Sequence, residues 1–153
     1  IGKTAPYFNI LNADGKRINR SDFKDKYLLI HFWASWDLQS REANASLRRI
    51  YQQEKKNKKF ALLGISLDID RKEWEEAIQK DTLKWEQACD FSGWSTETSK
   101  QIAIQALPAN ILLNASGKIE GKNMSEEAIE KKLKEIEQKE KEKKEAEKKK
   151  VKR

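Results

Sequence analysis

A chain of 153 residues, 37% of them hydrophobic, is long enough to bury the core of one domain. Lys and Arg number 32 against 25 Asp and Glu, giving a net charge of +7, and residues 125–153 hold 12 of the basic and 9 of the acidic residues. The tail therefore supplies +3 and the body +4. No apolar run approaches the roughly 20 residues that a membrane-spanning helix needs, and no basic-then-apolar signal segment opens the chain.

The first half of the chain is predicted to form a hairpin, a buried strand and a helix. Residues 8–23 contain two short strands around an Asp-Gly turn, which is a strong hairpin signal. Residues 27–34 are almost continuously apolar, a pattern typical of a strand covered on both faces. From Ser40 the apolar residues take a helical spacing, which predicts a helix that reaches about Lys55.

Strands and helices continue to alternate in the second half. Asp70 and Glu73 form a capping-box pattern at one helix start, and Pro108 ends another helix because proline disfavours a helical conformation in the residue before it. The expected elements are a strand over 58–68, a helix to about residue 80, a short strand over 83–89, a helix over 95–106 and a hairpin over 109–121. This order predicts an α/β sheet closed by a hairpin and a last helix.

The C-terminal segment is predicted to begin as a packed helix and to end as a solvated one. Ser125 caps the helix, and its apolar stripe ends at Ile136. Residues 137–153 offer almost nothing to bury, but carry Glu-to-Lys pairs four residues apart, so we expect a domain over 1–136 and a charged helical tail that frays at its end. Acidic residues are mixed in and no aromatic residue is present, so nucleic acid is not an expected partner, whereas contact with anionic surfaces remains open. The tail lacks the apolar repeat of a coiled coil.

The first residue and the single cysteine bear on the context of the chain. Because the sequence starts at Ile1 rather than at methionine, we expect a leader or a neighbouring domain before it. Cys89 is the only cysteine, so a disulfide would need a second molecule.

Three stretches stand out in order along the chain: "GKTAPYF" at 2–8, "GKRINRSDFKDKYLLIHFWASW" at 15–36 and "ALPANILLNASGKI" at 106–119. Together they resemble the thioredoxin-like domains of the TlpA/ResA group, within the wider AhpC/TSA and redoxin families. The resemblance covers residues 2 to about 136. It implies a thioredoxin-like α/β fold with a central mixed sheet flanked by helices. Together with the elements expected from the residues, this fold has an N-terminal β-hairpin extension and a C-terminal charged helix. The resemblance also implies an extracytoplasmic location, periplasmic or membrane-anchored facing the periplasm.

In that family the tryptophan is followed by a C-x-x-C motif, and the positions that match the two cysteines are Asp37 and Ser40. Thiol-disulfide exchange needs a thiolate at the helix N-terminus and a second thiol that resolves the mixed disulfide. Neither a carboxylate nor a hydroxyl can do this, so no catalytic residue is expected here. A helix start that stabilises a thiolate also stabilises a carboxylate, and Asp37 is therefore predicted to cap the helix by accepting from the backbone of Gln39 or Ser40. Contact of Asp37 with a ligand is the alternative.

The resemblance implies that Pro108 is a cis-proline, in a loop that pairs with extended substrate peptides through backbone hydrogen bonds. Such pairing does not need cysteine. The first functional hypothesis is therefore a thioredoxin-fold domain that has lost redox catalysis and binds a protein or an extended peptide. The expected groove residues are Trp36, Asp37, Leu38, Gln39, Ser40, Leu107 and Pro108, with Trp36 exposed beside the groove.

Two alternatives stay open in the sequence. A thiol-disulfide oxidoreductase or peroxidase could work through Cys89, which would then be an exposed thiol with a low pKa rather than a buried small hydrophobic residue. An interaction protein could act through its basic tail, and it would lose binding to anionic partners when residues 138–153 are removed or salt is added.

The only histidine, His31, offers a hydrolytic reading with a serine such as Ser35 or Ser40 and the acid Asp37. It precedes Asp37 by six residues on a strand, about 20 Å if the chain stays extended, which is too far for a proton relay. A core or half-buried histidine is therefore expected. One histidine and one cysteine make no zinc spacing, and the scattered glycines form no phosphate loop, so neither a metal nor a cofactor is expected.

Overall fold

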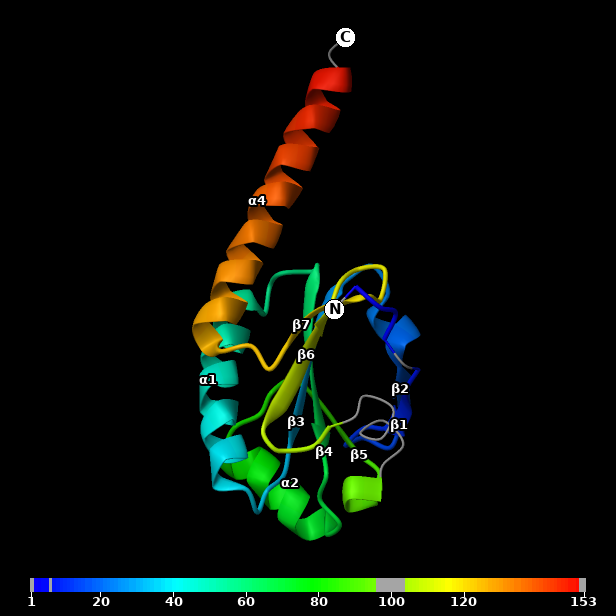
Figure 1. Ribbon diagram of the computed structural model, residues 1–153, viewed down its shortest axis with the longest axis vertical. Coiled ribbons are helices and arrows are strands. Elements are labelled where there is room, and N and C mark those ends of the chain that lie inside the picture. Colours follow the sequence, from blue (N-terminus) through cyan, green and yellow to red (C-terminus); the bar gives the residue numbers. More distant parts are fainter. Residues whose placement is uncertain (1, 6, 96–103, 152–153) are drawn as a thin grey trace. The chain divides into compact units, whose positions relative to one another are not determined.

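The computed structural model describes residues 2–5, 7–95 and 104–151. By its internal contacts the chain divides into two compact units, Ile1–Asn123 and Met124–Arg153. The described part of the first unit holds a two-stranded sheet, a five-stranded sheet and two α-helices (Figure 1). Its elements are β1 (Asn9–Leu11), β2 (Arg17–Asn19), the 3-10 helix η1 (Arg20–Phe23), β3 (Tyr27–Trp33), α1 (Leu38–Glu54), β4 (Phe60–Ser66), α2 (Arg71–Lys80), β5 (Glu86–Cys89), the 3-10 helix η2 (Gly93–Ser95), β6 (Ala109–Leu113) and β7 (Ile119–Lys122).

The larger sheet is mixed, with the strand order β5-β4-β3-β6-β7. β3 pairs with β4 in parallel and β4 with β5 in parallel, whereas β6 runs antiparallel to β3 and β7 antiparallel to β6. Leu29 and Ile30 at the middle of β3 are completely buried, as the continuous apolar run predicted for a strand covered on both faces. The predicted thioredoxin-like mixed sheet is therefore confirmed.

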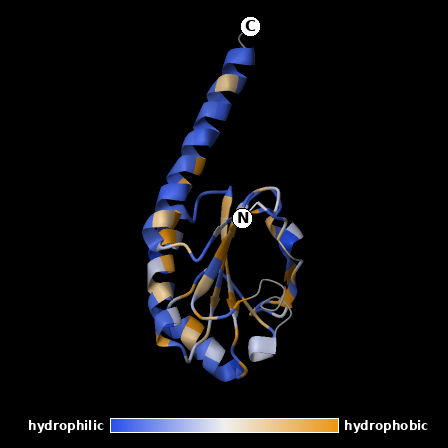
Figure 2. Cartoon of the chain, in the orientation of Figure 1, coloured by the Kyte–Doolittle hydropathy of each residue, from blue (hydrophilic) through white to orange (hydrophobic). Residues whose placement is uncertain are grey.

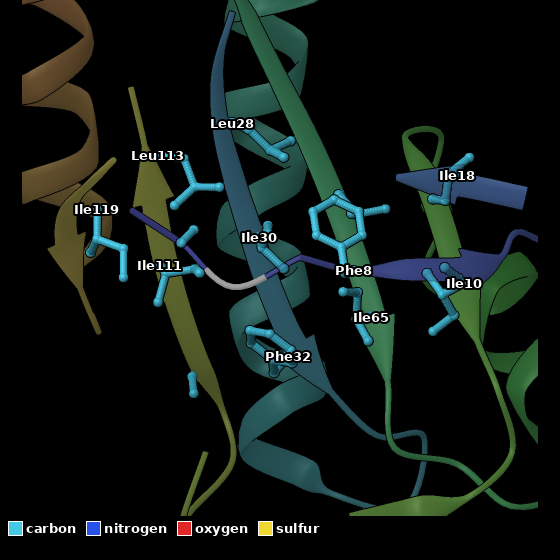
Figure 3. Close-up of a cluster of buried hydrophobic side chains, with 14 residues drawn as sticks. Phe8, Ile10, Ile18, Leu28, Ile30, Phe32, Ile65, Ile111, Leu113 and Ile119 are labelled. Carbon is cyan, nitrogen blue, oxygen red and sulfur yellow. The ribbon is translucent and has the colours of Figure 1, made fainter. Parts of the chain in front are cut away.

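The two faces of this sheet are covered by different elements. The β1–β2 hairpin lies over one face, and α1 lies on the other (Figure 1). Ile10 and Ile18, one from each hairpin strand, belong to the same buried cluster as Ile30 and Phe32 of β3 (Figure 3). The central strands are mostly hydrophobic, while the helices mix polar and apolar residues (Figure 2). Residues of β3 at odd positions therefore face α1, where the polar groups described below lie.

Three local details refine the expectations from sequence. The segment after β2 forms η1, because Asn19 caps it and the Asn19 backbone N–H donates in return to Asp22 Oδ2 at 2.8 Å. Helix α1 begins at Leu38, two residues earlier than its apolar spacing indicated. The helix expected over 95–106 falls largely on residues 96–103, outside the described residues.

The second unit contains α4 (Glu126–Val151). Ser125 opens this helix as predicted, since its Oγ accepts from the Ala128 backbone N–H at 3.1 Å. The buried residues of α4 are Ile129, Leu133 and Ile136. All of residues 141–150 are exposed. The boundary expected between a domain over 1–136 and a tail over 137–153 stays a prediction. No helix in the described ranges combines the length and apolarity that crossing a bilayer requires.

Candidate functional site

Asp37 stands where the chain, having left β3, turns into α1. Its backbone N–H donates to the Ala34 carbonyl at 3.2 Å, and its extended conformation (φ −101°, ψ 111°) is that of a helix N-cap. Asp37 Oδ2 accepts a hydrogen bond from the Ser40 backbone N–H at 2.9 Å. The predicted cap is confirmed, and it places a carboxylate on the positive end of the α1 dipole.

Ser40, which the resemblance matches to the second cysteine, is also hydrogen-bonded to Asp37. Ser40 is completely buried, and its Oγ donates to the same Asp37 Oδ2 at 2.6 Å. Asp37 and Ser40, which the resemblance matches to the two cysteines, are therefore bonded to one another through a single carboxylate oxygen. With no sulfur at either position, this pair cannot form or exchange a disulfide.

The loop before β6 lies beside this helix start. The Leu107-Pro108 peptide bond is cis, as the resemblance implied, and both side chains are half-buried. Ala109 follows directly and pairs with Phe32 near the end of β3. Among the described residues, no backbone hydrogen bond involves the Leu107 N–H or C=O.

Two exposed apolar side chains flank the cap. Trp36 is 57% exposed and Leu38 is 73% exposed, and the neighbouring Gln39 is exposed as well. Trp36 also lines a shallow cavity of about 350 Å³. Its lining residues are Ser35, Trp36, Arg41, Glu73, Glu76, Ala77 and Lys80. The exposure expected for Trp36 is confirmed.

Asp68, which the sequence analysis did not single out, holds the loop that carries Trp36. Asp68 is buried, and its carboxylate accepts from the Ser35 backbone N–H at 3.1 Å and from the Ser35 Oγ at 2.5 Å. The Ser66 hydroxyl donates to the same carboxylate. Asp68 follows the end of β4, the parallel neighbour of β3, and that position was a signal available in the sequence, because the carboxyl ends of parallel strands meet at one edge.

Arg41 ties the first turn of α1 to the segment after α2. Its guanidinium forms a two-pronged ion pair with Asp81, in which Nη2 lies 2.8 Å from Oδ1, and its Nη1 donates to the Ser35 carbonyl at 3.0 Å. The Asp81 carboxylate raises the pKa of Arg41. The guanidinium is thus occupied by the protein itself.

His31 lies under the start of α1, and the expected burial of its side chain is confirmed. The strand end and the helix start fold back on one another, so the imidazole meets the backbones of Ser40 and Ala109 and the side chain of Asn44. Burial lowers the pKa of His31 to about 4, and those contacts offset the effect only in part. In the described part of the chain, His31 Nε2 and the Asn44 amide have no partner in ordinary hydrogen-bond geometry. Because the Ser40 hydroxyl donates to Asp37, no relay joins it to His31.

Cys89 is buried, with 2% of its surface exposed. Burial raises the pKa of this thiol to about 11. Its Sγ lies 3.4 Å from the Asp68 carbonyl oxygen and accepts from the Phe91 backbone N–H at 3.4 Å. The thiol is therefore neutral and shielded, which is the opposite of what a reactive cysteine needs. Within the described residues, no three His, Cys, Asp or Glu side chains are grouped so that they could hold a metal ion.

Comparisons with known proteins agree with this architecture. Residues 25–119 match the family model described as thioredoxin-like. A thiol-disulfide oxidoreductase ResA of Bacillus thuringiensis is 30% identical over 142 residues, which cover 89% of this chain and 78% of the relative. A thiol-disulfide oxidoreductase of Bacteroides fragilis superposes with a TM-score of 0.84 at 55% identity, over 88% of this chain and 99% of that one. A solved thiol:disulfide interchange protein of a Bacteroides species has a TM-score of 0.77 at 26% identity, over 88% of each chain. The chain therefore belongs to the thioredoxin-like family, as a domain of the TlpA/ResA type among the thiol-disulfide oxidoreductases.

Proposed function

We propose that this domain binds an extended peptide segment beside its cis-proline loop and does not exchange disulfides. The proposal rests on one observation above all. Asp37 and Ser40, which the resemblance matches to the two cysteines of the family, are hydrogen-bonded to each other at the start of α1. A site arranged in this way keeps the family's helix start but has no thiolate to attack a disulfide.

The surroundings of the pair support binding. In this proposal an extended segment adds to the N–H and C=O of Leu107 in the manner of a strand, and the exposed Trp36 offers it an aromatic face. Leu38 and Gln39 are exposed on the same turn and complete the expected groove. An extracytoplasmic site of action, in the periplasm or on a membrane anchor facing it, is part of the proposal and is supported by the family resemblance.

The two alternatives receive different support. A one-cysteine enzyme needs an accessible thiolate, and the burial and raised pKa of Cys89 argue against it. An arm that binds anionic surfaces stays an alternative, because α4 ends in a fully exposed, lysine-rich stretch. Removal of residues 138–153 distinguishes the two functions, because it should abolish binding to anionic surfaces through the arm and leave peptide binding at the groove unchanged.

Redox activity is tested by a thiol-disulfide exchange assay on the natural chain, its Cys89→Ser variant and an Asp37→Cys/Ser40→Cys double variant. We expect that only the double variant reduces disulfides. If the natural chain reduces disulfides and the Cys89→Ser variant does not, the protein is a one-cysteine enzyme instead.

Binding is tested by selecting from a cysteine-free peptide display library and measuring affinities for the selected peptides. The variant Trp36→Ala is expected to weaken binding about tenfold or more, as truncation of an aromatic anchor does. The matched control is Tyr7→Ala, which removes a similarly exposed aromatic side chain outside the groove. Equal affinities of natural chain and Trp36→Ala would contradict the proposed site.

A further inference from the structure

The first unit contains a larger cavity at the opposite end of the five-stranded sheet. It lies where η1 and the chain entering β3 meet the turn between β6 and β7, and its volume is about 590 Å³. Small-molecule sites in proteins typically measure about 300 to 1,000 Å³. Its lining residues are Tyr7, Asn19, Arg20, Ser21, Phe23, Lys24, Asp25, Lys26, Leu28, Leu113, Asn114, Ala115, Ser116 and Gly117.

Arg20 is held in this cavity by the backbone around it. It is half-buried, and its Nη1 donates to the Ala5 carbonyl at 3.2 Å. A Cβ on Gly117 would stand 3.0 Å from the guanidinium carbon, so the absence of a side chain there lets the guanidinium lie against the turn. Gly117 also has a φ of +84°, which favours glycine independently. The turn between β6 and β7 therefore makes room for a positioned cation.

The charge of the cavity is not balanced by the protein. Arg20, Lys24 and Lys26 line it against one carboxylate, that of Asp25. Throughout the described ranges, no ion pair joins any of these three cations to a carboxylate. A guanidinium carries five N–H donors, of which Arg20 uses one on the Ala5 carbonyl. The remaining donors suit a carboxylate or a phosphate, both of which arginine can bind with two parallel hydrogen bonds.

The other walls are apolar. Phe23 is half-buried, Leu28 and Leu113 are buried, and Tyr7 stands 62% exposed at the rim. We propose that this cavity binds a small molecule in which a carboxylate or phosphate group is joined to an aromatic or aliphatic body. The anionic group lies on Arg20, with Lys24 and Lys26 nearby, and the apolar body lies against Phe23 and Tyr7. This site is independent of the peptide groove.

The test is an NMR titration of the intact chain with four probes: phenyl phosphate, phenylacetate, inorganic phosphate and the neutral benzyl alcohol. We expect both aromatic anions to shift the amide signals of Ser116 and Gly117. Inorganic phosphate should bind more weakly than these anions, and benzyl alcohol should bind most weakly of the four. The two aromatic anions show which oxyanion the site prefers. Absence of shifts at this turn with every probe would overturn the proposal.

Variants separate a built site from diffuse surface charge. Arg20→Gln is expected to raise the dissociation constant of the better aromatic anion about tenfold or more, whereas Lys72→Gln, which removes an exposed cation on α2, leaves it unchanged. Because Arg20 also bonds the Ala5 carbonyl, Tyr7→Ala provides a second probe. This variant is expected to weaken the binding of phenyl phosphate and to leave the binding of inorganic phosphate unchanged. Equal weakening by Arg20→Gln and Lys72→Gln, or no effect of Tyr7→Ala, would contradict the proposed geometry.

Discussion

His31 is predicted to make the protein lose stability as the pH falls below neutral. Its pKa is about 4 in the folded protein and about 6.5 in an unfolded chain, so between these values the unfolded state binds the additional proton. Each tenfold difference in proton affinity corresponds to about 1.4 kcal/mol, which gives about 3 kcal/mol in total. That contribution is fully present above the unfolded pKa and is lost as the pH falls from about 6.5 towards 4.

The assay compares urea unfolding of the natural chain and of His31→Gln at several pH values from 7.5 to 4.5. Carboxylates titrate in both proteins, so their effects on stability largely cancel when the two proteins are compared. Between pH 7.5 and 4.5 the free energy of unfolding of the natural chain should therefore fall by about 2 to 3 kcal/mol more than that of the variant. Because His31 is the only histidine, its imidazole signal can also be followed directly by NMR. Parallel stability profiles for the two proteins, or an imidazole that titrates near 6.5, would refute the reasoning.

Three further outcomes are expected. Asp37→Ala should lower the free energy of unfolding by about 1 kcal/mol in urea melts, because the α1 cap is lost, and an unchanged midpoint would count against the cap. Gly64→Ala should destabilise the fold by about 1 to 3 kcal/mol, because a Cβ there overlaps the Gln87 side-chain amide, and the double variant with Gln87→Ala should recover part of the loss. Cys89 should react with a thiol reagent in urea but only very slowly in the folded protein, and rapid native labelling would show that it is accessible.

The sequence predicted those features that short segments determine alone. The Asp37 cap and the apolar run of β3 depend on neighbouring residues, so both followed from local pattern. The contact between His31 and the start of α1 could not be predicted in this way, because a count of residues along an extended strand ignores the turn that brings the helix back over the sheet. The same holds for Arg20 and Gly117, which are 97 residues apart and meet only once the sheet has formed.

The bonds of Asp68 bear on the affinity of the proposed peptide binding. The loop carrying Trp36 is fixed at Ser35 from two sides, by the Asp68 carboxylate and by the Arg41 guanidinium. A receptor loop that is already ordered loses little conformational entropy when a partner arrives, so most of the ordering cost of binding falls on the partner. A partner restrained in its extended form should therefore bind more tightly than a flexible one of the same sequence.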